Sequence, residues 1–297
     1  MKKLGFLSIA LIVLISCNPQ KKVDKKNYYK ASDFTAPGEF TSGIEGPAWG
    51  SDGFLYLVNF EKEGTIGRIN SSAESELFVE LPEGSIGNGI RFHSDGSMLI
   101  ADYKKHNILR VEMKTKEISV YAHNDEMNQP NDLAISGNNT LYLSDPDWKN
   151  STGKLWKVDP DGKISLLEEK MGTTNGVEVS PGDDILYVNE SVQRKIWAYD
   201  ILPDGNITNK RLFYKFNDFG MDGMRCDKEG NLYVTRHGKG TVVVLSPGGE
   251  ILHEVKMKGE KTSNIAFGGE DGQTCFVTLQ DRGSVEKFYS EIAGRDF

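Results

Sequence analysis

The sequence predicts an all-β protein of six similar units, and two observations lead to this prediction. A carboxylate or carboxamide residue opens a short apolar segment six times, at spacings of 42 to 47 residues: Glu45, Asn88, Asn131, Asn175, Asp222 and Asn264. A turn follows about eight residues after each start, and a second apolar run follows the turn. A strand–turn–strand repeat of about 45 residues is typical of a propeller with four-stranded antiparallel blades. We therefore expect a six-bladed β-propeller.

The pattern of residues 1–16 indicates an export signal, so we expect these residues to lie outside the folded domain. Lys2 and Lys3 precede an apolar run, residues 4–15, that is too short for an ordinary transmembrane helix. The run ends in Leu14-Ile15-Ser16-Cys17, which resembles the lipobox of bacterial lipoproteins. That resemblance implies cleavage before Cys17 and lipidation of its thiol, and an ordinary signal peptide is the alternative. We therefore expect an exported bacterial lipoprotein, periplasmic or surface-facing, that contacts the membrane only through this anchor.

Two segments follow the signal peptide. Residues 17–37 are polar and rich in lysine, which is typical of a flexible tether, and residues 38–297 form the expected propeller. The sixth repeat has a third strand at residues 284–289 but only a poor candidate for a fourth strand. We expect residues between Tyr28 and Phe40 to pair there and close the ring, because an open edge strand invites aggregation.

Charge and cysteine content narrow the possible partners. The chain has 297 residues, a formal net charge of −8 and no basic stripe interleaved with aromatic residues, so we expect no nucleic-acid partner. We expect a monomer that acts on a small molecule. Cys226 and Cys275 both fall in strands, and an exported compartment permits a disulfide between them. Two buried free thiols are the preferred interpretation.

The six repeat starts are the main functional candidates. The first strand of each blade lines the channel of a propeller, so these side chains would face one another. Asn88-Gly89 and Asn175-Gly176 could instead be plain hairpin turns, which Asn-Gly favours. A turn does not explain Glu45 and Asp222, because burying a carboxylate is costly unless it is paired or binds metal. No Lys or Arg occupies any of the six positions. The oxygen ligands favour Ca²⁺ or Mg²⁺ over Zn²⁺.

A second set of polar residues lies at the end of the second strand of five repeats: Asn59, Asp102, Asp145, Glu190 and Arg236. Such residues can reach a ligand in the channel, or they can simply cap turns. We favour turn capping for Asn59 and Glu190 and a pocket role for Asp145, while Asp102 is open between the two. The sequence has no G-x-S-x-G elbow and no metal-spaced histidine pair, which argues against those hydrolase types.

Five segments resemble the SMP-30/gluconolactonase/LRE-like family: Glu45–Trp49, Pro130–Asp132, Thr174–Gly176, Asp222–Met224 and Ser263–Gly269. The likeness covers residues 43–290, with the motifs in the family's order. It implies a six-bladed propeller with a divalent cation in the channel, usually calcium, and hydrolysis of sugar lactones or related cyclic esters.

The resemblance also assigns roles to single residues. By position, Glu45, Asn175 and Asp222 match the family's metal ligands, and Asn131 matches a residue that binds metal or substrate. Asp145 resembles an acidic pocket residue proposed as general acid and base in bacterial lactonases.

Two departures from the family pattern concern the substrate and leave the metal ligands intact. Gln129 stands where the animal sugar lactonases carry an arginine, and Asp102-Tyr103-Lys104 replaces the Glu-His-Gly of many bacterial members. Substrate contacts are expected from Asn88, Asn131, Asp102 and Arg236.

The sequence therefore predicts a calcium-dependent hydrolase that opens a lactone in the channel, with Mg²⁺ or Zn²⁺ as alternative cations. Asp145 or Asp222 would accept a proton from the attacking water and return it to the leaving alkoxide. One alternative is a lipid-anchored, non-enzymatic propeller that binds an oxidised sugar or a protein partner, with structural calcium. Hydrolysis of organophosphates at the same site is a further alternative, as a side activity.

Overall fold

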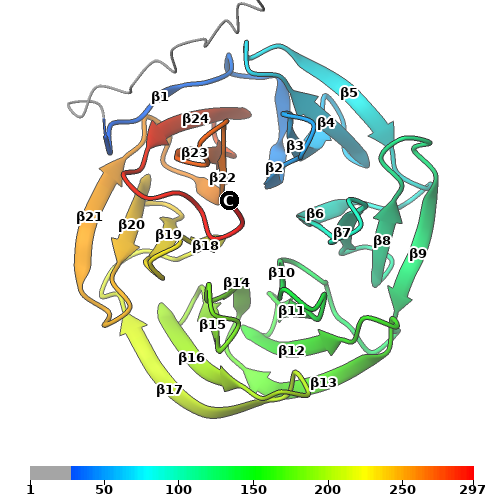
Figure 1. Ribbon diagram of the computed structural model, residues 1–297, viewed down its shortest axis with the longest axis vertical. Helices are drawn as coiled ribbons and strands as arrows, with labels where there is room; N and C mark the ends of the chain where they lie inside the picture. Colours follow the sequence, from blue (N-terminus) through cyan, green and yellow to red (C-terminus); the bar gives the residue numbers. More distant parts are fainter. Residues whose placement is uncertain (1–27) are drawn as a thin grey trace, which may run out of the picture.

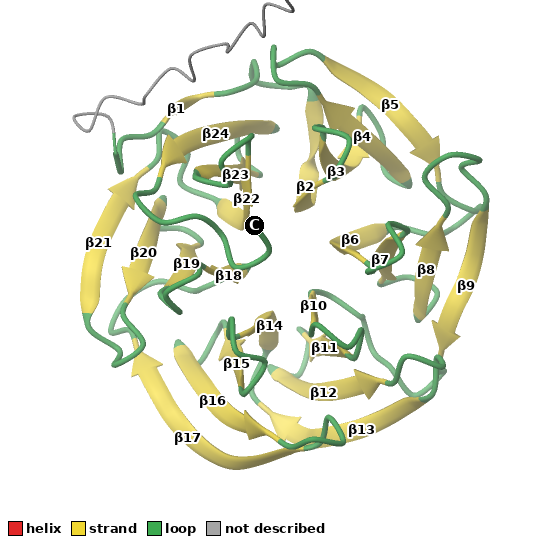
Figure 2. Ribbon diagram, viewed as in Figure 1, coloured by secondary structure: helices red, strands yellow, loops and turns green. Residues whose placement is uncertain are grey.

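Five repeats of the sequence each form one four-stranded sheet, and the sixth repeat forms three strands of another. The six sheets are arranged around a common axis (Figure 1). The computed structural model describes residues 28–297, and these contain strands and loops only (Figure 2). The predicted six-bladed β-propeller with antiparallel four-stranded blades is therefore confirmed. The predicted signal peptide, the lipidation site Cys17 and the first part of the tether lie outside the described residues.

The first three blades follow one another along the chain, and each begins with its innermost strand. Blade one comprises β2 (Phe40–Trp49), β3 (Leu55–Phe60), β4 (Thr65–Ile69) and β5 (Ser75–Glu80). Blade two comprises β6 (Gly87–Phe92), β7 (Met98–Asp102), β8 (Asn107–Val111) and β9 (Ile118–His123). Blade three comprises β10 (Leu133–Ile135), β11 (Leu141–Asp147), β12 (Thr152–Val158) and β13 (Ile164–Met171).

The remaining blades repeat this order until the last strand of the ring. Blade four comprises β14 (Thr174–Val179), β15 (Ile185–Glu190), β16 (Lys195–Ile201) and β17 (Ile207–Lys215). Blade five comprises β18 (Met224–Cys226), β19 (Leu232–Arg236), β20 (Thr241–Leu245) and β21 (Ile251–Lys256). Blade six comprises β22 (Thr262–Gly268), β23 (Thr274–Leu279), β24 (Ser284–Tyr289) and β1 (Ser32–Asp33).

The N-terminal part of the described chain closes the ring. Strand β1 pairs antiparallel with β24, with Ser32 opposite Lys287. The backbone N–H of Val285 donates to Thr35 Oγ1 at 3.0 Å, and Phe34 packs against Phe276 of β23. The expected closure by residues 28–40 is thus confirmed. Residues 28–37, which the sequence assigns to the tether, pack against the last blade.

The hydrophobic core lies between neighbouring blades. The second strand of blade one has every residue buried, because each of its faces meets an adjoining layer of side chains. Val58 of β3 and Ile100 of β7 belong to one buried cluster that joins blades one and two. Cys226 and Cys275 are buried, free thiols in such layers, which confirms the preferred interpretation. In residues 28–297 no helix has the length and apolar character needed to cross a bilayer.

Candidate metal centre and substrate channel

Five of the six repeat starts meet in one cavity on the axis of the ring. Glu45, Asn88, Asn131, Asn175 and Asp222 all line a cavity of about 310 Å³. They come from five different blades: Glu45 lies inside β2, Asn88 and Asn175 are the second residues of β6 and β14, and Asn131 and Asp222 precede β10 and β18. Asn264, the sixth start, donates a hydrogen bond of 3.0 Å from Nδ2 to Glu45 Oε2. The structure therefore brings the predicted metal ligands together.

Backbone irregularity next to these residues explains how their side chains are aimed. The pairing of β2 with β3 changes register on both sides of Glu45, and a similar shift separates Thr174 from Val177 in β14. Gly46 has a φ of +59°, and a Cβ there would overlap the carbonyl oxygen of Asn88 in the next blade. Asn175-Gly176 lies inside a strand, so it is not a hairpin turn. The Asn-Gly pair instead permits close approach of adjacent blades.

Burial and like charge perturb the two carboxylates of the cavity. Glu45 is 5% exposed, and its Oε2 accepts hydrogen bonds from the Gly46 N–H and from Asn264. Burial raises the pKa of Glu45 to about 7, and the nearby charge of Asp132 contributes in the same direction. The pKa of Asp222 is raised well above its ordinary value, first by burial and then by the charges of Glu45 and Asp132. Among the described residues that line the channel, none is Lys or Arg.

The residues present fit a hard divalent cation. Asn175 Oδ1 is buried and has no hydrogen-bond partner among the described residues, which is costly unless it receives a ligand. Glu45 and Asp222 both carry a carboxylate in this cavity, and no cationic side chain in the lining balances their charge. Burying these charges is costly unless a cation binds. No group of three or more His, Cys, Asp or Glu side chains is assembled for a metal within residues 28–297. The site therefore depends on amide oxygens beside two carboxylates, a donor set that suits Ca²⁺ or Mg²⁺.

A second cavity of about 320 Å³ adjoins the first and shares Glu45, Asn88, Asn131, Trp148 and Gln280 with it. Tyr103 and Gln129 complete much of its wall. We call the two cavities together the channel site. Its wall is made largely of side-chain amides, with one exposed indole at Trp148.

Sequence reasoning missed several residues of the channel site. Among them, Gly43, Glu63, Ser191 and Gln280 all line it. Gln280 and Ser191 directly follow second strands, so a wider window at that repeat position would have found both. His237 also lines the channel site, where its ring contacts Gln280 Oε1 at 3.3 Å. Burial lowers the pKa of His237, which favours the neutral imidazole.

Asp145 does not join the channel site, contrary to its predicted catalytic position. It is fully buried, and its carboxylate accepts hydrogen bonds from the backbone N–H groups of Asn128 and Gln129 and from Trp156 Nε1. These bonds hold the loop that carries Gln129 and Asn131 into the channel. The structure therefore gives Asp145 a positioning role, with no free oxygen turned toward substrate.

Asp102 and Arg236 are also absent from the channel lining, although both were predicted to contact substrate. Asp102 Oδ1 accepts hydrogen bonds from the N–H groups of Ile86, Lys104 and Lys105. Arg236 forms an ion pair of 2.8 Å with Asp218, and its guanidinium lies over the Phe216 ring. The side chains of Asp102 and Arg236 therefore stabilise neighbouring loops through these contacts. Glu190 accepts a hydrogen bond from the Gly172 N–H, as the turn-capping interpretation predicts. Asn59 bonds to the backbone of Gly43 and Gly64 but also lines the channel site, so turn capping describes it only in part.

The family comparison agrees with this architecture. Residues 44–281 match the SMP-30/Gluconolactonase/LRE-like region, so the chain belongs to this family of gluconolactonase-like hydrolases.

Two relatives and one solved structure illustrate the breadth of the similarity. A gluconolactonase of Zymomonas mobilis is 29% identical over 271 residues, covering 79% of this chain and 75% of the relative. The diisopropyl-fluorophosphatase of Loligo vulgaris is 27% identical over 294 residues, covering 88% of this chain and 93% of the relative. A crystal structure of a calcium-binding protein, regucalcin, from Agrobacterium tumefaciens has a TM-score of 0.76 at 20% identity, and the match covers 90% and 94% of the two chains.

Proposed function

We propose that this chain is a divalent-cation-dependent lactonase that works in the channel site, with calcium as the cation. The observation that carries the proposal is the convergence of Glu45, Asn131, Asn175 and Asp222 on one cavity in which no Lys or Arg of the described chain takes part. The Zymomonas relative supports the activity by its name, and the regucalcin structure supports calcium in the same way.

Glu45, Asn131, Asn175 and Asp222 would hold the cation, since their oxygens are the hard donors gathered at the cavity. A cation bound there supplies Lewis-acid stabilisation of the negative charge that develops on the lactone carbonyl. Asp222 faces the same cavity and is the carboxylate left to hold a proton, since the Asp145 oxygens are occupied. Burial raises the pKa of Asp222 in the metal-free site, and a bound cation would lower it again, so Asp222 would accept the proton in its ionised form.

The wall of the channel site favours a neutral, hydroxyl-rich substrate. Asn88, Gln129 and Gln280 offer amide donors and acceptors, and Trp148 offers a flat apolar surface for the face of a ring. Without a cationic side chain in the lining, an anionic lactone has no partner for its charge.

The test is hydrolysis of a panel of aldonolactones and simple lactones by the purified protein. Each assay is run with EDTA and then with Ca²⁺, Mg²⁺ or Zn²⁺ restored. Turnover that EDTA removes and Ca²⁺ restores supports the proposal. Tight calcium binding without turnover of any lactone would instead favour a non-enzymatic binding propeller.

Hydrolysis of phosphotriesters is a second candidate activity. The observation that favours it is the similarity to the Loligo fluorophosphatase along nearly the whole described chain. A neutral phosphotriester also suits a cavity without cationic side chains. As a side activity, hydrolysis of diisopropyl fluorophosphate should be slower than that of the best lactone. EDTA should remove both activities to the same extent.

We further propose that the protein is exported and anchored to a membrane through a lipid on Cys17. The support is the sequence Leu14-Ile15-Ser16-Cys17 after a short apolar run. Cys17→Ser should release the protein from the membrane fraction of the producing cell. Retention of that variant in the membrane fraction would contradict the anchor.

A further inference from the structure

A layer of buried charged side chains crosses the axis of the ring next to the channel site. Its five members come from blades two to five and from the C-terminal segment: Arg91, Asp132, Glu178, Arg225 and Arg295. Arg91 Nη2 of blade two lies 3.3 Å from Glu178 Oε2 of blade four. Arg225 Nη1 of blade five lies 3.8 Å from Asp132 Oδ2 of blade three. These pairs join blades that are not neighbours, so they cross the axis. We call the five residues the charge layer.

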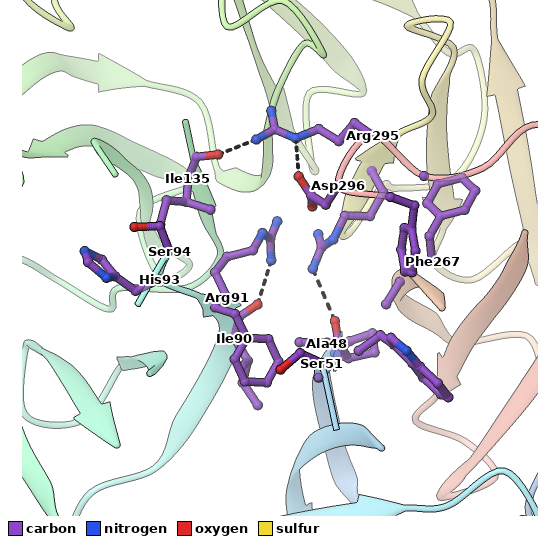
Figure 3. Close-up of a pocket in the computed structure, with 18 of the residues that line it drawn as sticks. Ala48, Ser51, Ile90, Arg91, His93, Ser94, Ile135, Phe267, Arg295 and Asp296 are labelled. Carbon is purple, nitrogen blue, oxygen red and sulfur yellow. Dashed lines mark hydrogen bonds and ion pairs between the residues drawn. The ribbon is translucent and has the colours of Figure 1, made fainter. Parts of the chain in front are cut away.

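The charge layer lies between the channel site and a cavity at the turns that follow the innermost strands. This cavity has a volume of about 770 Å³, and three members of the layer line it (Figure 3): Arg91, Arg225 and Arg295. It shares no lining residue with the channel site. Towards the channel site, Arg225 follows Asp222 by three residues and Asp132 directly follows Asn131. The charge layer is therefore the part of the interior next to the proposed metal ligands.

Arg225 is the member of the layer whose contacts lead to Glu45. It is 8% exposed, and its Nη1 donates to Met224 O at 2.7 Å and to Asn264 Oδ1 at 3.5 Å. Its Nη2 donates to Pro47 O at 3.3 Å. Asn264 in turn donates to Glu45 Oε2 at 3.0 Å, and Pro47 lies two residues after Glu45. One guanidinium group of blade five therefore bonds both to the amide that holds Glu45 and to the backbone beside it.

The contact with Arg225 favours one orientation of the Asn264 amide. Asn264 Oδ1 accepts hydrogen bonds from Arg225 Nη1 and from the Ile265 N–H, so the amide NH₂ is turned towards Glu45. The flipped amide would place its NH₂ against the guanidinium donors and its oxygen against the Glu45 carboxylate, which loses these bonds. Gly223 permits this packing, because a Cβ there would lie 1.9 Å from Asn264 Oδ1.

The same arginine restrains the backbone on the other side of Glu45. The pairing of β2 with β3 shifts register between Glu45 and Ala48, so the strand ladder does not hold this segment regularly. Pro47 has no N–H to donate to a ladder, and its carbonyl oxygen accepts from Arg225 Nη2. Arg225 thus supplies a contact to the irregular segment that carries a proposed metal ligand.

Arg295 belongs to the same layer but has no such contacts. It lies 3.6 Å from Glu178, and its other bonds go to the carbonyl oxygens of Val179, Ser180 and Ile135 and to Asp296. None of these partners lines the channel site. Arg295 therefore offers a matched control for the loss of a buried charge without a link to Glu45.

We propose that Arg225 is a positioning residue of the metal centre, a role that rests on the proposed function. It orients the Asn264 amide and restrains the backbone at Pro47, so that one Glu45 oxygen is held by Asn264 and the other is left for a cation. Arg225 acts through these groups and does not itself contact the cation or the substrate.

A double-mutant cycle on calcium binding tests this role, with titration calorimetry of the purified protein as the measurement. Arg225→Gln and Asn264→Ala should each weaken calcium binding by about tenfold. The variant with both changes should bind within about threefold of the weaker single variant, because Arg225 no longer has an amide to orient. A loss of roughly a hundredfold in the double variant is expected for independent effects and would overturn the proposal.

Arg295→Gln separates positioning from general stability. Removal of a charge from a buried network should lower the Tm of the metal-free protein in both Arg225→Gln and Arg295→Gln. Only Arg225→Gln should also weaken calcium binding. Equal calcium affinities in these two variants would contradict the positioning role. An original chain that binds no calcium would contradict the proposed cation as well, whereas calcium binding that Arg225→Gln leaves unchanged contradicts the positioning role alone.

Should Arg225→Gln fail to fold, Arg225→Lys decides. Lysine keeps the charge near Asp132 and Glu178, but its single ammonium group cannot reproduce the forked contacts with Pro47 O and Asn264 Oδ1. Calcium affinity should fall severalfold in this variant. Full calcium affinity in Arg225→Lys would show that the fork is not needed, and the proposal would fail.

Discussion

Asn264 Nδ2 donates a hydrogen bond of 3.0 Å to Glu45 Oε2 and so joins the last blade to the first beside the proposed metal centre. The bond leaves Glu45 Oε1 for other partners and fixes the carboxylate against β22. It also lowers the cost of holding a negative charge on Glu45, since the amide stabilises the ionised form. A contact between the first and last blades therefore also fixes the position of a proposed metal ligand.

Asn264→Ala should weaken calcium binding by about tenfold, because the ionised Glu45 loses a hydrogen bond to its charged oxygen. Calorimetric titration with calcium measures the change. Asn150→Ala, in an exposed turn after β11, is the control and should bind calcium like the original chain. Equal affinity in the two variants would show that the Asn264 bond does not organise the site.

Asp145→Asn should lower the free energy of unfolding by about 2–4 kcal/mol, because a buried acceptor of several N–H groups is replaced by a group that can satisfy fewer of them. Urea unfolding measures the loss. Asp147→Asn, two positions further on and only partly buried, should change stability little. Calcium affinity of the folded Asp145→Asn fraction should persist. Full stability combined with abolished turnover would restore the catalytic role that the sequence suggested.

The raised pKa of Glu45 predicts opposite effects of pH on the metal-free and calcium-loaded protein. Its pKa is about 7 in the folded chain and 4.5 ordinarily, so the native state binds more protons than the unfolded state between these values. The stability of the metal-free protein therefore falls as pH rises from 4.5 through 7, and Asp222 contributes with the same sign. Calcium must displace these protons, so its stabilising effect should be larger at pH 8 than at pH 5.5.

Thermal unfolding at the two pH values, with EDTA and with calcium, measures this linkage. Calcium should raise Tm by several degrees more at pH 8 than at pH 5.5. Glu45→Gln cannot titrate at this position and should lose most of the difference. The same calcium-induced shift at both pH values in the original chain would argue against Glu45 as a ligand.

The charge of the channel wall predicts discrimination between lactones. Glucono-1,5-lactone should be hydrolysed faster than its 6-phosphate, because no Lys or Arg of the described chain lines the channel site. Gln280→Lys places a cation in that wall and should shift the ratio of kcat/KM values toward the phosphate by roughly tenfold, a modest electrostatic gain. Gln273→Lys, just before β23 and outside the lining of the channel site, is the control. A preference for the phosphate in the original chain would contradict the neutral-substrate proposal.

The sequence predicted the fold and the meeting of the repeat starts, because both follow from periodicity. Once Glu45 and Asp222 occupy equivalent positions in a closed ring, their approach to one axis follows from the topology. The roles of the polar residues at the ends of the second strands were harder to predict. Spacing places Asp145 and Asp102 at the correct end of a strand, but it does not determine the direction of each side chain. Both carboxylates accept hydrogen bonds from backbone N–H groups of neighbouring loops. The spacing of residues along the sequence does not reveal loop geometry of this kind.

The C-terminal segment shows a second limit of sequence reasoning. Residues 291–297 looked like a poor fourth strand, and they are not one, because β1 fills that place in blade six. Arg295 instead contacts carbonyl groups of Ile135 and Val179, which are far away along the chain. Contacts of this kind depend on the finished ring, so the position of the C-terminal segment could not be inferred from composition or periodicity.

Parallel titration of calcium binding and of glucono-1,5-lactone turnover tests the central claim most directly. In the original chain, bound calcium and kcat/KM should rise with the same midpoint. Asp222→Asn should lose both, because it removes one of the two carboxylates of the proposed centre. Arg211→Gln is the control and should retain both, because that arginine lies on the outer strand β17 and pairs with Asp200. Lactone turnover that persists in EDTA, or in Asp222→Asn without bound calcium, would contradict the account.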